Sequence, residues 1–190
     1  MGKKKGAVFL DRDGTIIEEV NYLRHPAEIR LLPGAARALR IMQERYPLVI
    51  VTNQAGVARG YFDEQRLEEI HRHLEGLLNM EEGRLAGIYY CPHHPEAVCT
   101  SYRQECQCRK PKPGMLQAAA RDLAIDLSKS YTVGDKLSDI GAGKNAGTKT
   151  ILVRTGYGKE HEKQIAGSPF CPDYIADNLL AAANWILQHG

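Results

Sequence analysis

The sequence contains no long hydrophobic segment. Among its 190 residues, no run approaches the roughly 20 apolar residues that a membrane-spanning helix needs. The first apolar stretch, residues 7–10, is also shorter than the apolar region of a secretory signal peptide. We therefore expect a cytoplasmic protein that does not bind membranes.

The sequence also has little charge imbalance and few aromatic residues. Its 25 Lys and Arg residues nearly balance 23 Asp and Glu residues, for a net charge of +2, and 7% of its residues are aromatic. A nucleic-acid-binding protein usually shows a basic stripe or stacking aromatics. Without either feature there is no electrostatic case for nucleic acid as the main partner.

Five cysteines are present, but no export signal accompanies them. Disulfide frameworks occur mainly in exported proteins, so we expect these thiols to be reduced. A hydrophobic content of 43% and a charged content of 25% are ordinary for a soluble globular protein. This length predicts a single domain, residues 1–190, with a modest insertion. No apolar stripe suggests self-association, so a monomer is expected.

Strand-like and helix-like segments alternate along the chain. Apolar runs at 7–10, 48–52, 87–90, 130–133 and 150–153 predict strands, and helical patterns occupy 35–45, 64–78, 114–123 and 178–188. Asp63 and Asp177 precede two of these helices as candidate N-caps. The alternation predicts an α/β protein whose parallel sheet is covered by helices on both faces. Only residues 91–109, rich in Cys, His and Pro, break the pattern, and they predict a loop insertion.

Two carboxylates follow the first predicted strand in the stretch Asp11-Arg12-Asp13-Gly14-Thr15. Residues i and i+2 of an extended chain point the same way, so the side chains of Asp11 and Asp13 are expected to project together. Two such charges repel each other unless a cation or a shared proton offsets them. A hard divalent ion such as Mg²⁺ fits this requirement.

Further polar residues follow the other predicted strands. Thr52 ends the second strand, Lys110 closes the insertion, and Asp135 follows the fourth strand. A carboxylate, a hydroxyl, a lysine and a further acid form a consistent set for phosphoryl transfer, which depends on positioning and charge neutralisation. In this scheme Asp11 is the nucleophile. Asp13 is the general acid and base, which predicts a raised pKa for its carboxyl group.

The insertion carries two pairs of soft metal ligands. Cys91 and His93 are separated by one residue, as are Cys106 and Cys108. Structural zinc is bound tetrahedrally by four ligands of these types, and a loop of this length buries too little apolar surface to be stable alone. We therefore predict a zinc-stapled loop. His93 is preferred over the adjacent His94 because its spacing matches that of the second pair.

Taken in order, the motifs V-F-L-D-R-D-G-T, V-T-N-Q, R-K-P-x-P-G and V-G-D-K-x-x-D resemble those of the haloacid dehalogenase-like phosphatases. The resemblance spans residues 7–156 and implies a capless Rossmann-like sheet of five or six strands. It implies that Thr52 and Lys110 stabilise the phosphoryl group. It also implies that Mg²⁺ binds the Asp11 carboxylate, the Asp13 backbone carbonyl and Asp135.

Within that group, Y-Y-C-P-H-H-P followed by C-x-C-R-K-P resembles the D-glycero-D-manno-heptose 1,7-bisphosphate 7-phosphatases of nucleotide-activated heptose and lipopolysaccharide core synthesis. The resemblance implies that the zinc-bound loop presents Arg109 to the substrate. The other residues implied to contact substrate are Glu19, Asn21, Tyr22, Asn53, Gln54 and Lys136.

Histidinol-phosphate phosphatases share the same loop, so histidinol phosphate or another small phosphate ester stays open as the substrate. The sequence fixes neither the sugar anomer nor the source pathway, lipopolysaccharide or glycoprotein heptose. A non-catalytic zinc-binding module is a further alternative, but it predicts loss of the nucleophile, acid or lysine, and Asp11, Asp13 and Lys110 are all present.

Overall fold

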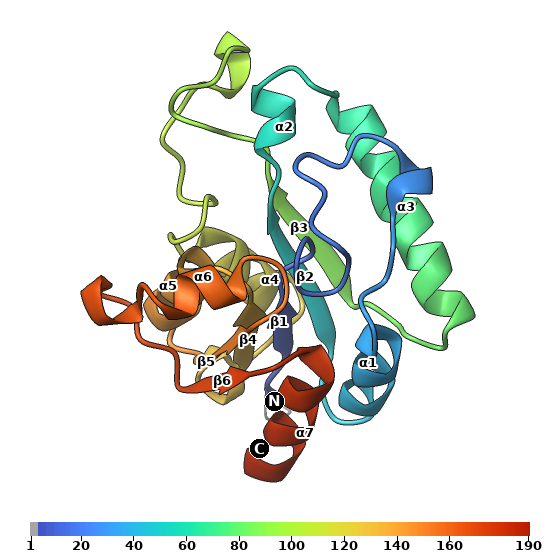
Figure 1. The fold of residues 1–190 in the computed structure, drawn as a ribbon, viewed down its shortest axis with the longest axis vertical. Helices are drawn as coiled ribbons and strands as arrows, with labels where there is room; N and C mark the ends of the chain where they lie inside the picture. The colour runs from blue at the N-terminus through green and yellow to red at the C-terminus, as the bar shows by residue number, and fades with distance from the viewer. Residues whose placement is uncertain (1–3) are drawn as a thin grey trace.

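The computed structural model describes residues 4–190, and they form a six-stranded sheet in which all paired strands are parallel (Figure 1). The strands are β1 (Val8–Leu10), β2 (Leu48–Asn53), β3 (Gly87–Cys91), β4 (Tyr131–Gly134), β5 (Lys149–Val153) and β6 (Tyr174–Ala176). The helices are α1 (Ala35–Gln43), α2 (Ala55–Ala58), α3 (Glu64–Met80), α4 (Gly114–Asp122), α5 (Leu137–Ala146), α6 (Gly158–Glu162) and α7 (Leu179–His189). The predicted α/β fold is confirmed.

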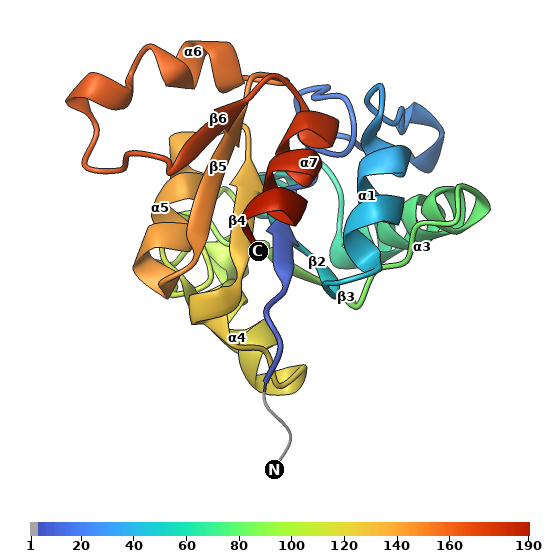
Figure 2. The same ribbon diagram turned by 90° about the horizontal axis from the view of Figure 1, so that it is seen from below.

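Helices cover both faces of the sheet because the residues of each buried strand point alternately to either side. Val8 and Leu10 of β1 pack in one apolar cluster with α1, α3 and α7, whereas Phe9 packs in a second cluster with α4 and α5. Figure 2 shows these two groups of helices on opposite sides of the sheet. All three β1 side chains are completely buried, so the strand that precedes Asp11 is anchored from both faces.

The strand order is β3-β2-β1-β4-β5-β6, so the chain reverses its direction across the sheet between β1 and β4. Ligands of such sheets bind beyond the carboxyl ends of the strands at this reversal. Asp11 directly follows β1, and its backbone N–H donates to the carbonyl of Val133 in β4 at 2.9 Å. Asp135 directly follows β4. The topology therefore places both aspartates at the point where this class of fold binds its ligands.

The predicted elements occur with small differences at their ends. The five predicted strands are present, whereas β6 was not predicted because its three residues carry little periodic signal. Asp63 caps α3 as predicted, accepting from the backbone N–H of Arg66 at 2.8 Å. The prediction that Asp177 caps the last helix is wrong. The cap is Asn178, whose side chain accepts from the N–H of Ala181 at 2.9 Å.

The irregular segment that contains the insertion begins after Cys91, the last residue of β3. It ends at Gly114, the first residue of α4. It contains only the short 3₁₀-helix Thr100–Tyr102. No regular element fixes its course, so its conformation depends on side-chain contacts.

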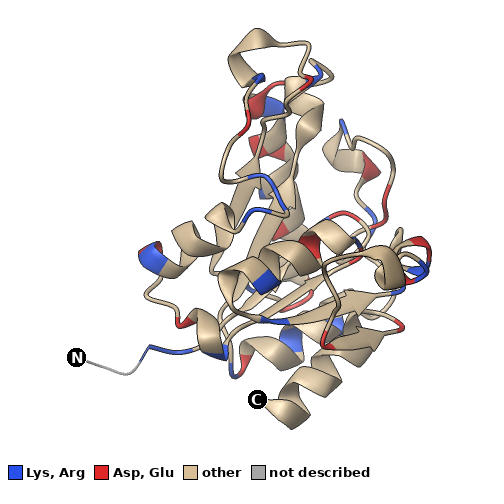
Figure 3. Cartoon of the chain, turned by 90° about the vertical axis from the view of Figure 1, so that its left-hand side faces the viewer, with Lys and Arg blue, Asp and Glu red and all other residues tan. Residues whose placement is uncertain are grey.

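None of the helices described in residues 4–190 is long and apolar enough to span a membrane. In the view of Figure 3, basic and acidic residues are interspersed over the elements. This matches the balanced composition.

Candidate active site

A cavity of about 300 Å³ lies beyond the carboxyl ends of the strands. All eleven catalytic and substrate-contacting residues predicted from the sequence line it: Asp11, Asp13, Glu19, Asn21, Tyr22, Thr52, Asn53, Gln54, Arg109, Lys110 and Lys136. Ser138, Asp139 and Tyr157 are among the further lining residues. The structure thus brings together residues separated by up to 146 positions, from Asp11 to Tyr157.

The Lys110 ammonium lies at the centre of the charged groups. Its Nζ donates to Asp11 Oδ1 at 2.7 Å and to the Val51 carbonyl at 2.7 Å, and it lies 2.6 Å from Asp139 Oδ1. Burial alone would lower the pKa of Lys110, but the two carboxylates outweigh it and raise that pKa above its ordinary value. Lys110 is therefore a permanent cation whose three N–H groups all have partners.

Three buried carboxylates gather beside this lysine. Asp11, Asp135 and Asp139 can each place an oxygen within 4.8 Å of the others. Burial and then the neighbouring carboxylates raise the pKa of Asp135, and burial likewise raises that of Asp11 although Lys110 opposes it. The concentration of negative charge favours a bound cation.

Asp135 has one carboxylate oxygen that is free to bind a cation. Its Oδ2 accepts from the backbone N–H of Tyr157 at 2.9 Å, while its buried Oδ1 has no hydrogen-bond partner among the described residues. A buried carboxylate oxygen without a partner is costly unless a cation or water satisfies it. Carboxylate oxygens are the preferred ligands of Mg²⁺, so the donor set fits this ion.

Two glycines make room for the Asp135 carboxylate. A Cβ atom on Gly14 or on Gly156 would overlap Asp135 Oδ2. Gly14 also has a φ of +81°, which other residues rarely adopt. The chain turns at Gly14, and the close approach of Asp135 explains why no larger residue fits there.

The Asp13 carboxylate is held by two side chains. Arg12 Nε and Nη2 donate to its two oxygens at 3.1 and 3.0 Å, and Gln54 Nε2 donates to Oδ2 at 2.9 Å. Burial favours a raised pKa, but the Arg12 charge and these hydrogen bonds outweigh it and lower the pKa of Asp13. The expectation of a raised pKa is wrong for this state of the protein, because Arg12 pairs with Asp13 and the sequence did not reveal that pairing.

The side chains of Gln54 and Asn53 form hydrogen bonds to other residues that line the cavity. Gln54 Nε2 also donates to Thr52 Oγ1 at 2.8 Å, so one amide joins Thr52 to Asp13. The Asn53 side chain accepts from the Lys110 N–H at 3.1 Å and donates to the Lys110 carbonyl at 3.2 Å. Asn53 thus fixes the backbone that carries the buried lysine.

The loop after β1 closes the other side of the cavity. Glu19 accepts from Lys136 Nζ at 3.0 Å and from the N–H of Asn21 at 2.9 Å. Asn21 and Tyr22 both have positive φ values, 50° and 71°. The Tyr22 ring packs edge-on against Tyr61, with 4.9 Å between their centroids. The predicted substrate-contacting loop is therefore held in place from two sides.

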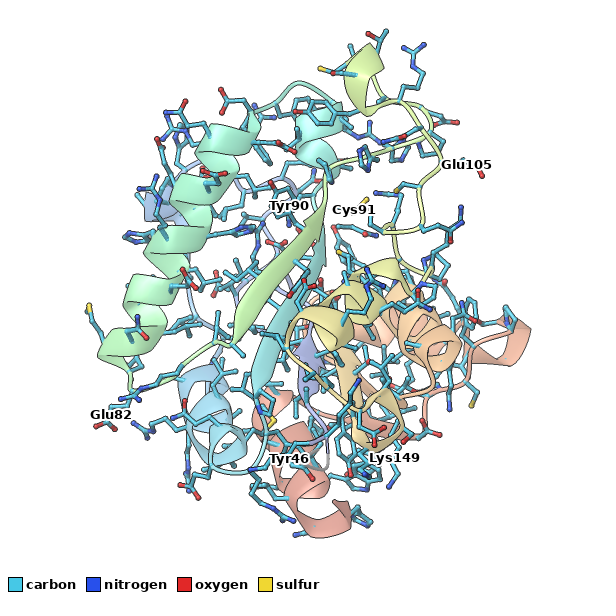
Figure 4. The ribbon with its side chains drawn as sticks, turned by 180° about the vertical axis from the view of Figure 1, so that it is seen from behind. Tyr46, Glu82, Tyr90, Cys91, Glu105 and Lys149 are labelled. Carbon is cyan, nitrogen blue, oxygen red and sulfur yellow. The ribbon has the colours of Figure 1, made fainter. Side chains whose placement is uncertain are left out.

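The predicted zinc ligands form a cluster that joins the two ends of the insertion. Cys91, His93, Cys106 and Cys108 offer ligand atoms that lie within 4.8 Å of one another. Figure 4 shows Cys91 at the end of β3 next to Tyr90, with the loop that carries Glu105 running beside it. Three sulfurs and one imidazole nitrogen match a structural zinc site. His94 lies outside the cluster and accepts from the Glu96 N–H instead.

This cluster is linked directly to the cavity. Arg109 follows Cys108 and donates from Nη1 to the carbonyl of His93 at 3.2 Å. The same short segment continues to Lys110. A metal that fixes the four ligands would therefore also fix Arg109 and Lys110, two of the cationic residues that line the cavity.

Sequence reasoning did not single out Arg12 or His71. Arg12 is only 1% exposed, and its Nη1 lies 3.1 Å from His71 Nε2. Residues 67, 70, 71, 74 and 78 form the buried face of α3, so helical spacing could have placed His71 inside. No sequence signal indicates that the arginine between two aspartates turns inward.

The buried lysine generates a stability prediction. Lys110→Met leaves the Asp11 and Asp139 carboxylates without their cation, and we expect the free energy of unfolding in magnesium-free buffer to fall by about 3 kcal/mol. The matched control is Lys112→Met, because Lys112 is 41% exposed and lies 3.7 Å from an exposed Glu105. That change is expected to cost under about 1 kcal/mol. Equal losses in urea denaturation would contradict this account of Lys110.

Comparisons with known proteins agree with this geometry. The HAD-hydrolase-like family model matches residues 107–182. The chain is 50% identical to the D-glycero-beta-D-manno-heptose-1,7-bisphosphate 7-phosphatase of Haemophilus ducreyi, covering 82% of this chain and 86% of the relative. It is 42% identical to the enzyme of that name from Escherichia coli K12, over 99% of this chain and 91% of the relative.

Solved structures give the same result. The D,D-heptose 1,7-bisphosphate phosphatase of B. bronchiseptica, complexed with magnesium and phosphate, superposes with a TM-score of 0.84 at 34% identity and covers 97% of this chain and 99% of its own. The Burkholderia thailandensis enzyme of that name has a TM-score of 0.70 at 29% identity, over 96% of this chain and 99% of its own. The resemblance found in the motifs is confirmed, and the chain belongs to the heptose-1,7-bisphosphate 7-phosphatase family of haloacid dehalogenase-like hydrolases.

Proposed function

We propose that the protein removes the C7 phosphate of D-glycero-β-D-manno-heptose 1,7-bisphosphate, a step toward nucleotide-activated heptose for the lipopolysaccharide core. The observation that carries this proposal is the buried Asp11 carboxylate, which is held by Lys110 and lines the same cavity as Asp13. The names of the relatives support the substrate and the β anomer.

The reaction proceeds in two displacements at phosphorus. Lys110 holds Asp11 Oδ1, so we assign the attack on phosphorus to Oδ2. As the new bond forms, the bond from phosphorus to the C7 oxygen breaks, and Asp13 donates a proton to that oxygen. Water then attacks the aspartyl phosphate while Asp13 takes its proton. Release of inorganic phosphate restores the Asp11 carboxylate.

Arg12 and Gln54 favour the charged form of Asp13 in the free enzyme. This is the form that accepts the proton of water in the second displacement. A negatively charged phosphate bound beside Asp13 favours proton uptake before the first displacement, because like charges raise the pKa of a carboxyl group.

We assign Mg²⁺ to the Asp11 carboxylate, the Asp13 backbone carbonyl and Asp135. The unpartnered Asp135 Oδ1 supports this assignment, as does the magnesium in the B. bronchiseptica structure. When bound, the ion supplies positive charge that offsets the charge on the carboxylates and the transferring phosphoryl group. Asp139 is occupied differently, since its oxygens pair with Lys110 and with the backbone N–H of Lys136.

The remaining predicted residues act on the substrate or its surroundings. Thr52 and Lys110 stabilise the phosphoryl group, and Arg109 contacts the sugar hydroxyls or the second phosphate through its planar guanidinium. Glu19, Asn21, Tyr22, Gln54 and Lys136 line the cavity and complete the substrate surface. Asn53 contributes mainly by holding the Lys110 backbone. We further propose a monomeric, single-domain protein of the cytoplasm.

The substrate assignment is tested by comparing kcat/KM for phosphate release from the β and α anomers of heptose 1,7-bisphosphate and from histidinol phosphate. We expect the β anomer to exceed histidinol phosphate by about a hundredfold, or about 2.7 kcal/mol of transition-state discrimination. Asp11→Asn is the control for contaminating phosphatases. A preference for histidinol phosphate would overturn the substrate and the role of Arg109.

We propose that Cys91, His93, Cys106 and Cys108 hold one structural zinc ion. Metal analysis of protein purified without chelator is expected to find about one zinc per chain. The double change of Cys106→Ser and Cys108→Ser removes two ligands and is expected to abolish zinc binding. Cys171→Ser, at an exposed cysteine outside the cluster, is the matched control and should retain it. Absence of zinc from the unaltered protein would leave the cluster as free thiols.

A further inference from the structure

Arg12 is a buried charged group that the proposed chemistry does not use directly. One edge of its guanidinium, Nε and Nη2, faces the two oxygens of Asp13, with a closest approach of 2.9 Å. The remaining nitrogen, Nη1, points the other way and lies 3.1 Å from His71 Nε2. Asp13 and His71, which are 58 positions apart in sequence, therefore contact the guanidinium on two opposite sides.

The chemistry of this contact fixes the state of His71. Arginine has only N–H donors, so His71 Nε2 must accept, and the ring must be neutral with its proton on Nδ1. Burial and then the Arg12 charge lower the pKa of His71 to about 3, so the ring stays neutral. His71 lies on the buried face of α3 and is 7% exposed.

Asp13 depends on Arg12 for its orientation. Gln54 Nε2 contacts only Asp13 Oδ2, whereas Arg12 Nη2 donates to Oδ1 as well. If His71 no longer accepts from Nη1, a buried N–H loses its partner, and a guanidinium only 1% exposed has to turn toward another acceptor. That rotation would release one carboxylate oxygen of Asp13.

We propose that His71 is a positioning residue for proton transfer: by accepting from Arg12 Nη1, it holds the guanidinium that aims the Asp13 carboxyl at the leaving oxygen. This inference rests on the proposed role of Asp13 as general acid. It gives α3, whose residues do not line the cavity, a part in the chemistry.

The test compares two substrates that differ in their need for a proton. The sugar phosphate releases a poor alkoxide leaving group, whereas p-nitrophenyl phosphate releases a stable phenolate. His71→Leu is expected to lower kcat/KM by about tenfold or more for the heptose bisphosphate and by less than about twofold for p-nitrophenyl phosphate. Because kcat/KM reports on steps through formation of the aspartyl phosphate, the later attack by water does not enter.

Two further variants separate positioning from folding. His71→Gln is expected to restore most of the activity, because its amide oxygen can accept from Arg12. His73→Leu changes an exposed histidine on the same helix and is expected to behave like the unaltered protein. Thermal unfolding establishes that each variant is folded. An equal loss for both substrates, or no loss in His71→Leu, overturns the positioning role.

Asp13→Asn distinguishes this failure from failure of the proposed mechanism. Selective loss for the heptose bisphosphate in Asp13→Asn, without selective loss in His71→Leu, refutes the inference about His71 alone. Equal loss for both substrates in Asp13→Asn refutes the general-acid role, and the inference about His71 then fails with it.

Discussion

The ion pairs of one buried ammonium group hold the site together. Lys110 Nζ lies within 2.7 Å of oxygens of both Asp11 and Asp139, in the buried wall of the cavity. Without this cation, burying these carboxylates side by side would be unfavourable, because each raises the cost of charging the other. The lysine backbone is held in turn by the Asn53 side chain, and Cys108 of the Cys/His cluster lies two residues before it.

The parallel sheet provides the rest of the geometry. Asp11 and Asp135 follow adjacent strands, so the pairing of β1 with β4 brings their side chains together directly. Gly14 and Gly156 then leave space for the Asp135 carboxylate, which keeps one oxygen free for a cation. The buried strands supply rigidity, while the loops after β1 and β3 bring Glu19, Tyr22 and Arg109 to the wall of the cavity.

Local patterns predicted much of this arrangement. Alternating apolar and helical segments identified five of the six strands of the described sheet, and the spacing of Cys91, His93, Cys106 and Cys108 identified the cluster. What could not be predicted depends on which way side chains turn. Arg12 turns inward to pair with Asp13. This pairing lowers the pKa of Asp13, which was expected to be raised. The three-residue β6 and the choice of Asn178 over Asp177 as a cap likewise depend on tertiary packing.

We propose that the phosphoryl group passes through Asp11 on its way to water. The most direct test is the stereochemical course at phosphorus, measured with a chiral, isotopically labelled phosphorothioate substrate in heavy-oxygen water. Each in-line displacement inverts the configuration, so two displacements through an aspartyl phosphate predict net retention. Net inversion would show that water attacks the substrate directly, without an aspartyl phosphate.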